Sequence, residues 1–350
     1  MPASTVYFAF PGKLETPSGG YHYDRRLIAE LRANGFIVEC LELAAAYPFP
    51  NQQDREHAAE TLANLPDGAL VIIDGLAFGV MAAIAAAEAE RLRLIALCHH
   101  PLSLESGLDR PRRQALHQGE KKALGFARAV IVTSAHTSTT LMDDFSVPAS
   151  QITVALPGTD PLPQAACDGN PMRLLTVASL IQRKAHDVLV TALASLRDLP
   201  WRARFVGSTE FDPAWAERIS KQVRNSGLQD RIIFSGPVSD PKPEYLDADA
   251  FVLPSRYEGY GMVFAEALAA GLPIVAARAG AVPDVVPESA GLLVPPDDAD
   301  ALASALRRLL TNTRLRQDLR RQAQEAATRL PTWSESAQRV AATLKEVQRS

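Results

Sequence analysis

Cysteine is scarce in this 350-residue sequence, and the three that occur form no C-x-x-C pair. Cys40, Cys98 and Cys167 lie far apart, which argues against a disulfide framework and favours a reducing compartment. An excess of positive charge is also missing, because 36 basic residues face 40 acidic ones and give a formal net charge of −4. We therefore expect no nucleic-acid partner, since binding of that kind needs a basic surface.

The chain also has no long uninterrupted apolar run. Its most apolar window, residues 69–87, contains Asp74 and Gly75 near its centre, so we interpret it as a strand, a turn and a helix. The N-terminus, MPASTVYFAF, has neither a basic segment nor a long apolar core, so we expect no signal peptide and a cytoplasmic protein. The basic segments 110–113 and 121–122 fit a solvated face better than a contact with membrane lipids, so peripheral membrane contact is not favoured.

Several catalytic signatures are missing too. The sequence contains no G-x-x-x-x-G-K-[ST] and no G-x-S-x-G, which excludes a P-loop nucleotidase and the common serine-hydrolase motif. Gly259 and Gly261 lack the third glycine of a dinucleotide fingerprint. No D-x-D segment stands at a plausible strand end, so we expect neither a metal nor a metal-bridged diphosphate site.

What the chain does contain is a regular alternation of short apolar runs with helix-like segments, which is typical of a parallel, doubly wound α/β sheet. A Pro- and Gly-rich segment, 157–171, divides this pattern near the middle of the chain. We predict Rossmann-like domains over residues 1–165 and 166–330, followed by a C-terminal helix within residues 331–350. The predicted strands are 5–10, 36–40, 70–73, 94–98, 129–133, 152–154, 173–177, 203–206, 231–234, 251–253, 273–276 and 291–294.

The stretch from Phe251 to Pro273 carries the strongest functional signal. It reads as a buried strand, a glycine turn and a helix, an arrangement in which backbone N–H groups and the positive end of the helix dipole favour an anion. Glu258 precedes the turn and Glu266 lies about one helical turn inside the helix. Carboxylates beside an anion site suit a ligand with both hydroxyls and phosphates, such as a nucleotide sugar.

Glu258, seven residues and Glu266 resemble the E-x7-E signature of the retaining family-four glycosyltransferases, and the surrounding PSRYEGYGMVFAEALAAGLPIVA is similar to that family's motif. The resemblance implies a GT-B fold, in which two Rossmann-like domains face a central cleft. The first domain would bind the acceptor, the second would bind the donor, and the last helix would cross back to the first domain. Segment 280–284 resembles the family's G-G-x-P-E and is expected to mark the fold more than the chemistry.

The same resemblance assigns roles to the residues of the motif. Glu258 would bind hydroxyls of the donor sugar, and Glu266 would bind the ribose hydroxyls. The backbone N–H groups near the sugar and phosphates would come from Gly259, Tyr260 and Gly261.

Arg183 and Lys184 follow the first strand of the second domain, where fixed cations would stabilise a departing diphosphate. In the resembled family this stretch reads G-R-x-x-x-x-K-G. Lys184 matches it directly, Ser179 stands where the arginine usually does, and Arg183 is a reasonable substitute for it. Ala185 replaces the final glycine. An ordinary basic pair on the surface is the alternative interpretation.

His99 and His100 follow a strand of the first domain, at the edge where open α/β sheets bind ligands. Neighbouring strand residues point to opposite faces, so both imidazoles do not easily bind one metal. The resemblance places the family's functional histidine at His99, with His100 in place of an aspartate, and which of the two faces the cleft stays open. Gly19 and Gly20 would let the backbone approach the donor phosphate or the acceptor.

These observations predict a retaining, metal-independent glycosyltransferase that needs no cofactor. It would move a hexose from a nucleoside-diphosphate sugar to a hydroxyl of a sugar, lipid-linked or small-molecule acceptor. Two alternatives remain open: a nucleotide-sugar epimerase or sugar phosphorylase of the same fold, and a non-catalytic protein that binds nucleotide sugars. The sequence does not specify the sugar, the base, the acceptor or the oligomeric state.

Overall fold

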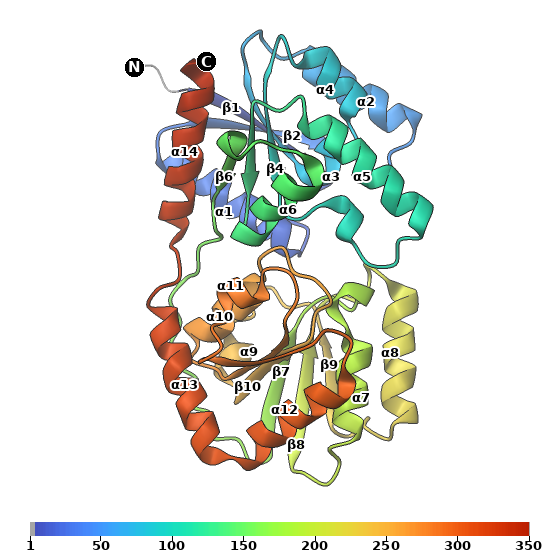
Figure 1. Ribbon diagram of the computed structural model, residues 1–350, viewed down its shortest axis with the longest axis vertical. Helices are drawn as coiled ribbons and strands as arrows, with labels where there is room; N and C mark the ends of the chain where they lie inside the picture. Colours follow the sequence, from blue (N-terminus) through green and yellow to red (C-terminus); the bar gives the residue numbers. More distant parts are fainter. Residues whose placement is uncertain (1–3, 350) are drawn as a thin grey trace. The chain divides into compact units, whose positions relative to one another are not determined.

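Two six-stranded parallel sheets form the core of the computed structural model, which describes residues 4–349 (Figure 1). The chain divides into two compact units. Unit 1 runs to Gly158 and resumes at Pro331, and unit 2 comprises Thr159–Leu330. The doubly wound α/β architecture predicted from the sequence is therefore confirmed in both halves of the chain.

In unit 1 the strands lie in the order β2-β1-β3-β4-β5-β6. The chain reverses its direction of winding between β1 and β3, which is the switch point where open α/β sheets bind ligands. The strands are β1 (Thr5–Pro11), β2 (Ile37–Leu43), β3 (Leu70–Asp74), β4 (Arg93–Cys98), β5 (Ala129–Val132) and β6 (Ile152–Val154).

The helices of unit 1 form two layers. One layer contains α1 and α14, which pack together, and the other contains the contiguous row α2, α4, α5 and α6 (Figure 1). The helices are α1 (Gly19–Ala33), α2 (Gln52–Ala63), α3 (Gly75–Phe78), α4 (Ala82–Glu88), α5 (Arg110–Leu124), α6 (Ala135–Phe145) and α14 (Trp333–Arg349), with short 3-10 turns η1 (Leu102–Leu104) and η2 (Ala149–Gln151).

Unit 2 repeats the plan with the strand order β12-β11-β10-β7-β8-β9, so its switch point lies between β7 and β10. Its strands are β7 (Met172–Val177), β8 (Trp201–Val206), β9 (Ile232–Gly236), β10 (Ala250–Leu253), β11 (Ile274–Ala277) and β12 (Gly291–Val294). Its helices are η3 (Gln182–Lys184), α7 (His186–Ala194), α8 (Pro213–Asn225), α9 (Lys242–Leu246), α10 (Met262–Ala269), α11 (Val282–Val285), α12 (Ala299–Thr311) and α13 (Thr313–Ala327).

Each sheet is covered on both faces, which explains why its central strands are apolar throughout instead of alternating. Every residue of β3 (LVIID) and of β10 (AFVL) is buried. The covering helices are amphipathic instead, as in α12, where Leu302, Leu306 and Leu309 recur at helical spacing on the buried side. Among the described residues, no helix is both long enough and apolar enough to cross a membrane.

The Pro- and Gly-rich segment between the two sheets belongs mainly to unit 2. The backbone N–H of Ala165 donates to the carbonyl of Ala270 at 2.9 Å, and that of Gly169 donates to Oδ1 of Asp249 at 2.8 Å. The division between the units therefore falls after Gly158, a few residues before the boundary predicted at residue 165. Composition identified the segment, but its position depends on backbone hydrogen bonds that composition does not reveal.

Helix α14 completes unit 1 through an aromatic cluster at its start. Trp333 is only 5% exposed, and its ring lies 5.8 Å from that of Tyr23 and 5.7 Å from that of His22. The guanidinium of Arg26 lies 4.9 Å from the centre of the indole ring. A Cβ on Gly158 would lie 2.2 Å from the backbone nitrogen of Trp333, so only glycine fits where the chain passes this helix.

Replacing Trp333 by alanine should therefore destabilise unit 1. Truncation of a buried aromatic side chain costs about 3–5 kcal/mol, and the cation–π contact with Arg26 would be lost as well. We expect the unfolding transition of unit 1 to move to lower urea concentration, as followed by circular dichroism. The matched control is Gln338→Ala on the exposed side of the same helix, which should change stability by no more than about 0.5 kcal/mol. Equal effects of the two substitutions would contradict the assigned role of the indole.

Candidate functional site

Glu258 lies in the loop that follows β10, and three side chains fix its carboxylate. Lys184 donates from Nζ to Oε1 at 2.7 Å, and the Ser255 hydroxyl donates to the same oxygen at 2.6 Å. Arg183 lies 3.4 Å from Oε2. Burial acts to raise the pKa of Glu258, but the charges of Lys184 and Arg183 and the hydrogen bonds outweigh it and lower this pKa below its ordinary value. Glu258 is therefore ionised at neutral pH.

The two cations reach Glu258 because β7 and β10 are neighbours in the sheet. Arg183 and Lys184 lie on η3, directly beyond β7, and the glycine turn lies directly beyond β10. Arg183 also donates to the carbonyl of Tyr257 at 3.0 Å, and its own carbonyl accepts from the N–H of Arg256 at 2.8 Å. The structure therefore brings together the predicted residues Arg183, Lys184 and Glu258.

Ala185 ends η3 in the left-handed region, with φ of 52°. Glycine adopts this conformation without a steric penalty, whereas other residues pay for the clash of Cβ with the backbone. The resembled family has glycine at this position. The replacement of the family's glycine by Ala185 thus falls on the residue of this loop that has a positive φ. The surrounding structure holds the alanine in that conformation.

The glycine turn ends at Gly261, which has φ of +92° and begins α10. A Cβ there would lie 2.7 Å from Cδ2 of Phe264, so glycine is required for conformation and for space. No side chain among the described residues caps α10. Gly259 and Tyr260 precede it as predicted, and burial raises the pKa of Tyr260 to about 12, so its phenol stays protonated. Backbone N–H groups at a helix start of this kind favour an anion.

Gly280 supports Glu258 from the opposite side, a role that the sequence did not predict. The N–H of the next residue, Ala281, donates to the carbonyl of Glu258 at 2.9 Å. Gly280 has φ of +56°, and a Cβ there would lie 2.3 Å from the Glu258 carbonyl oxygen. Segment 280–284 was expected to mark the fold more than the chemistry, and its first glycine acts through the fold, because it supports the backbone of a candidate site residue.

Glu266 has a different environment from Glu258. It lies on α10 and accepts a hydrogen bond from the hydroxyl of Tyr245, on α9, at 2.7 Å. Removal from water raises the pKa of Glu266 to about 7, although the Tyr245 hydrogen bond acts to lower it. The two carboxylates of the motif therefore differ at neutral pH, where Glu258 is charged and Glu266 is partly protonated. Tyr245 was not identified from the sequence.

The predicted residues of unit 1 gather at His99, directly after β4. Its Nε2 lies 3.1 Å from Oδ1 of Asp24 and 3.4 Å from Oδ2 of Asp74, and both aspartates are buried. Gly20, on α1, lies against the ring, because a Cβ there would be 3.3 Å from Cδ2 of His99. Gly19 is the first residue of α1. Asp24 and Asp74 were not singled out as site residues, although Asp24 lies one helical turn after Gly20 and Asp74 ends an apolar strand.

His100 contacts a different carboxylate. Its Nε2 lies 3.2 Å from Oε2 of Glu105, in the loop that follows. The two adjacent histidines thus contact different carboxylates.

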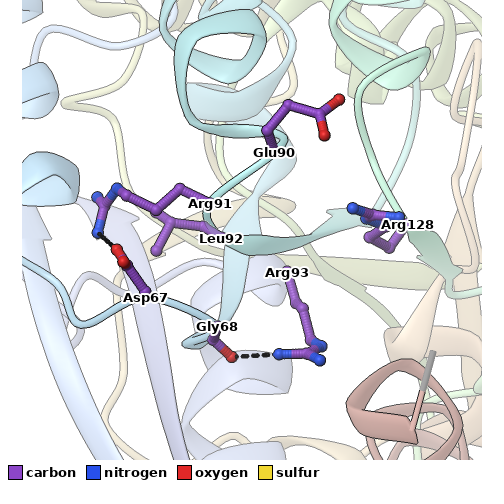
Figure 2. Close-up of a pocket in the computed structure, with 7 residues that line it drawn as sticks. All are labelled: Asp67, Gly68, Glu90, Arg91, Leu92, Arg93 and Arg128. Atoms are coloured by element: carbon purple, nitrogen blue, oxygen red, sulfur yellow. Dashed lines mark hydrogen bonds and ion pairs between the residues drawn. The ribbon is translucent and has the colours of Figure 1, made fainter.

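A pocket of about 470 Å³ lies elsewhere on unit 1 (Figure 2). Arg93 at the start of β4 lines it, whereas His99 follows the other end of that strand. Two of its three arginines are engaged with other lining residues: Arg91 pairs with Asp67 at 3.2 Å, and Arg93 donates to the Gly68 carbonyl at 2.9 Å (Figure 2). We therefore assign this pocket no part in the candidate site.

Two family descriptions match the chain, one in each half. Residues 163–326 match Glycosyl transferases group 1, and residues 69–161 match Glycosyltransferase Family 4. The first match contains Arg183, Lys184, Glu258 and Glu266, and the second contains His99.

Two named relatives are mannosyltransferases. The chain is 30% identical over 275 residues to MMP alpha-(1->4)-mannosyltransferase of Mycolicibacterium hassiacum, which covers 73% of this chain and 66% of that protein. It is 31% identical over 203 residues to the GDP-mannose-dependent alpha-(1-6)-phosphatidylinositol monomannoside mannosyltransferase of Mycobacterium tuberculosis, which covers 52% of each chain. The alignments thus span between about half and about two thirds of the length of these relatives.

The Anabaena protein HepE, solved in complex with UDP-glucose, matches the fold with a TM-score of 0.78 over 97% of this chain and 99% of its own, at 19% identity. The shared architecture is the GT-B fold, as predicted from the sequence. The chain belongs to the family-four glycosyltransferases of group 1.

Replacing Gly280 by alanine should destabilise the protein more than the strain of a positive φ alone would, because the added Cβ also clashes with the Glu258 loop. The added Cβ cannot stay 2.3 Å from the Glu258 carbonyl oxygen, so the backbone must shift. Gly236→Ala is the matched control, because Gly236 has φ of +68° with no atom within 4 Å of the added Cβ. We expect a loss of about 1–2 kcal/mol for the control and a clearly larger loss for Gly280→Ala in urea unfolding. Equal losses would show that Gly280 serves conformation only.

Proposed function

We propose that the protein transfers a hexose from a nucleoside-diphosphate sugar to a hydroxyl group of an acceptor, with retention of the anomeric configuration. The observation that carries the proposal is the cluster of Lys184, Arg183 and Glu258 beside the start of α10. Two cations and an uncapped helix start suit a diphosphate, and an ionised carboxylate next to them suits sugar hydroxyls. The residues of this cluster agree with family membership.

In this proposal the cations act on the leaving group. As the bond between the anomeric carbon and the phosphate oxygen breaks, negative charge grows on the diphosphate. Lys184 and Arg183 stabilise that charge more strongly than they stabilise the intact donor, which lowers the barrier. The acceptor hydroxyl attacks the anomeric carbon from the face that the diphosphate leaves, and its proton passes to the departing phosphate oxygen. No protein nucleophile is needed for retention along this route.

Glu258 and Glu266 then have separate tasks. Glu258, held by Lys184 and Ser255, accepts hydrogen bonds from hydroxyls of the transferred sugar. Glu266, bonded to Tyr245, accepts hydrogen bonds from the ribose. A diphosphate would compete with Glu258 for Lys184 and Arg183, so donor binding would redistribute an ion pair that already exists in the protein.

The sugar is proposed to be mannose or glucose. Both named relatives transfer mannose, one of them from GDP-mannose, and HepE was solved with UDP-glucose. The acceptor is proposed only as a hydroxyl compound bound by unit 1, because the relatives differ in what they glycosylate. An epimerase of the same fold would interconvert donors with no acceptor present, and a binding protein would bind a donor without turning it over.

Thermal melting against UDP, GDP, ADP, dTDP and their common sugars tests the donor assignment. A ligand at 100 times its Kd adds about 2.7 kcal/mol of stability, so one nucleotide series should raise the melting temperature clearly. We expect Glu266→Ala to lose most of that shift. An unchanged melting temperature with every nucleotide would argue against a nucleotide-sugar site.

Turnover of the identified donor tests the role of the cations. Lys184→Ala should lower kcat by about 100-fold or more, because it removes a charge that stabilises the leaving group. Lys221→Ala is the matched control, since Lys221 is an exposed lysine of the same unit that pairs with Glu217 on α8. The control should retain wild-type turnover. Near wild-type turnover of Lys184→Ala would refute the assigned role.

Donor affinity should also depend on pH through Glu266. Its pKa in the protein is raised to about 7, and ribose hydroxyls bind its ionised form better. Glu266 must therefore lose its proton before the donor binds tightly. The Kd of the donor should fall as pH rises from about 6 to about 8. Isothermal titration of wild type and Glu266→Gln separates this effect from ionisation of the nucleotide phosphate, which both proteins share. The same pH dependence in both proteins would contradict the role of Glu266.

A further inference from the structure

A histidine between two buried carboxylates is the feature of unit 1 that the proposed chemistry does not yet use. His99 presents the same ring atom, Nε2, to Asp24 at 3.1 Å and to Asp74 at 3.4 Å. The side chain of Asp24 is fully buried, that of Asp74 is 3% exposed, and that of His99 is 19% exposed. An ionised carboxylate can accept hydrogen bonds but cannot donate them, so Nε2 of His99 must carry the proton that the two aspartates share.

Asp74 is fixed independently of the histidine, whereas the carboxylate of Asp24 is held by its burial and by His99 itself. Asp74 uses Oδ1 to accept from the N–H of Leu76 at 2.8 Å, where it caps α3, and this leaves Oδ2 directed at His99. Asp24 lies within α1, and its Oδ2 is buried with no hydrogen-bond partner among the described residues. A buried carboxylate of this kind gains most from a neighbouring cation.

Of the other groups around His99, Arg25 also acts on Asp24 by its charge, but more weakly than His99 does. From α1, the ring of Tyr23 packs edge-on at 5.3 Å, and Tyr21 lies near both aspartates. From β5, the hydroxyl of Thr133 donates to the His99 carbonyl at 3.2 Å.

Cys98, buried beside His99 in the chain, stays a neutral thiol because burial, followed by the charges of Glu120 and Asp74, raises its pKa. The positive charge that acts most strongly on Asp24 is therefore that of the imidazole ring, which lies within 3.4 Å of both carboxylates.

We propose that Asp24 and Asp74 are positioning residues that hold His99 as a permanent imidazolium. The charge fixes Nε2–H on the carboxylates and leaves Nδ1–H as a donor, since no hydrogen bond to Nδ1 is present among residues 4–349. His99 then donates to a hydroxyl oxygen of the ligand in unit 1, and it does not serve as a general base. This role rests on the proposed function, because it defines how the same enzyme treats its substrate.

The balance of interactions around the ring agrees with the proposal. Burial acts to lower the pKa of His99, but the charges and hydrogen bonds of Asp24 and Asp74 outweigh burial and raise the pKa to about 10. Such an imidazolium keeps its proton over the whole physiological range. A bulkier residue at position 20 on α1 would press on the ring that the aspartates hold, since a Cβ there would lie 3.3 Å from Cδ2 of His99.

Nitrogen-15 NMR of the histidine rings tests the charge without any substrate. The His99 signal is assigned by its loss in His99→Gln. We expect it to remain that of an imidazolium up to pH 9 in the wild type, and its midpoint to fall by at least about 2 pH units in Asp24→Asn and in Asp74→Asn. Glu105→Gln is the matched control, because it removes the carboxylate beside His100 and should leave the His99 midpoint unchanged.

Two NMR results would overturn the proposal. A wild-type His99 that titrates near pH 6.5 would show that the carboxylates do not hold its charge. The oxygen and nitrogen atoms of Asp24, Asp74 and His99 also lie within 4.8 Å of one another, so they could instead hold a metal ion. Broadening of the His99 signal by stoichiometric Mn²⁺ in the wild type, lost in Asp24→Asn, would replace the imidazolium with a cation site.

Kinetics separate the proposal from the proposed function. In Asp24→Asn, the nucleotide melting shift of unit 2 should persist, while kcat should acquire a fall with rising pH that follows the lowered midpoint of His99. Wild-type kcat should show no such fall up to pH 9. The wild-type protein could also show no donor turnover while its His99 is an imidazolium. That result would refute the proposed glycosyltransferase function and would leave the assigned charge of His99 intact. A wild-type kcat that rises with the deprotonation of His99 would show a general base and refute the inference.

Discussion

A buried carboxylate must be neutralised, and this constraint organises unit 2. Glu258 is buried in the loop that follows β10. Its carboxylate can be ionised there only because Lys184 and Ser255 bond to it directly and Arg183 lies close by. That requirement fixes η3 against the glycine turn, although the two segments are far apart in the sequence. The adjacency of β7 and β10 in the parallel sheet makes it possible, because both strands end at the same edge.

Unit 1 solves the corresponding problem with the opposite sign arrangement. In unit 2 one carboxylate is shared by two cations, whereas in unit 1 one imidazole is shared by two carboxylates. Both clusters lie beyond the carboxyl ends of central strands, beside the start of a helix. The first leaves positive charge in surplus and the second leaves negative charge in surplus. A phosphate would thus be drawn to the first cluster, and a neutral hydroxyl compound is the better match for the second.

The fold was predictable because its signal is local. A strand covered on both faces is apolar throughout, so β3 and β10 stand out as short runs such as LVII and FVL. The E-x7-E stretch could also be predicted from the sequence, since its strand, turn and helix are continuous in the chain. The role of Tyr245 could not be predicted in this way. Tyr245 and Glu266 are 21 residues apart in the sequence and meet only when α9 and α10 pack together. Asp24 and Asp74 meet His99 only through tertiary packing, and Gly280 gains its role from a contact with Glu258 that no spacing encodes.

The placement of α14 has a consequence for how the protein is made. Unit 1 is interrupted by the whole of unit 2, and its sheet and α1 are completed by residues that the ribosome adds after unit 2. Arg93 bonds to the carbonyl of Val347, and the hydroxyl of Thr153 meets that of Thr343. Domains fold as units during synthesis, so the sheet that emerges first cannot bury its α14 face until unit 2 has already been translated. Unit 2 can therefore complete its fold before unit 1 does, and the strands of unit 1 stay partly uncovered until α14 has been translated.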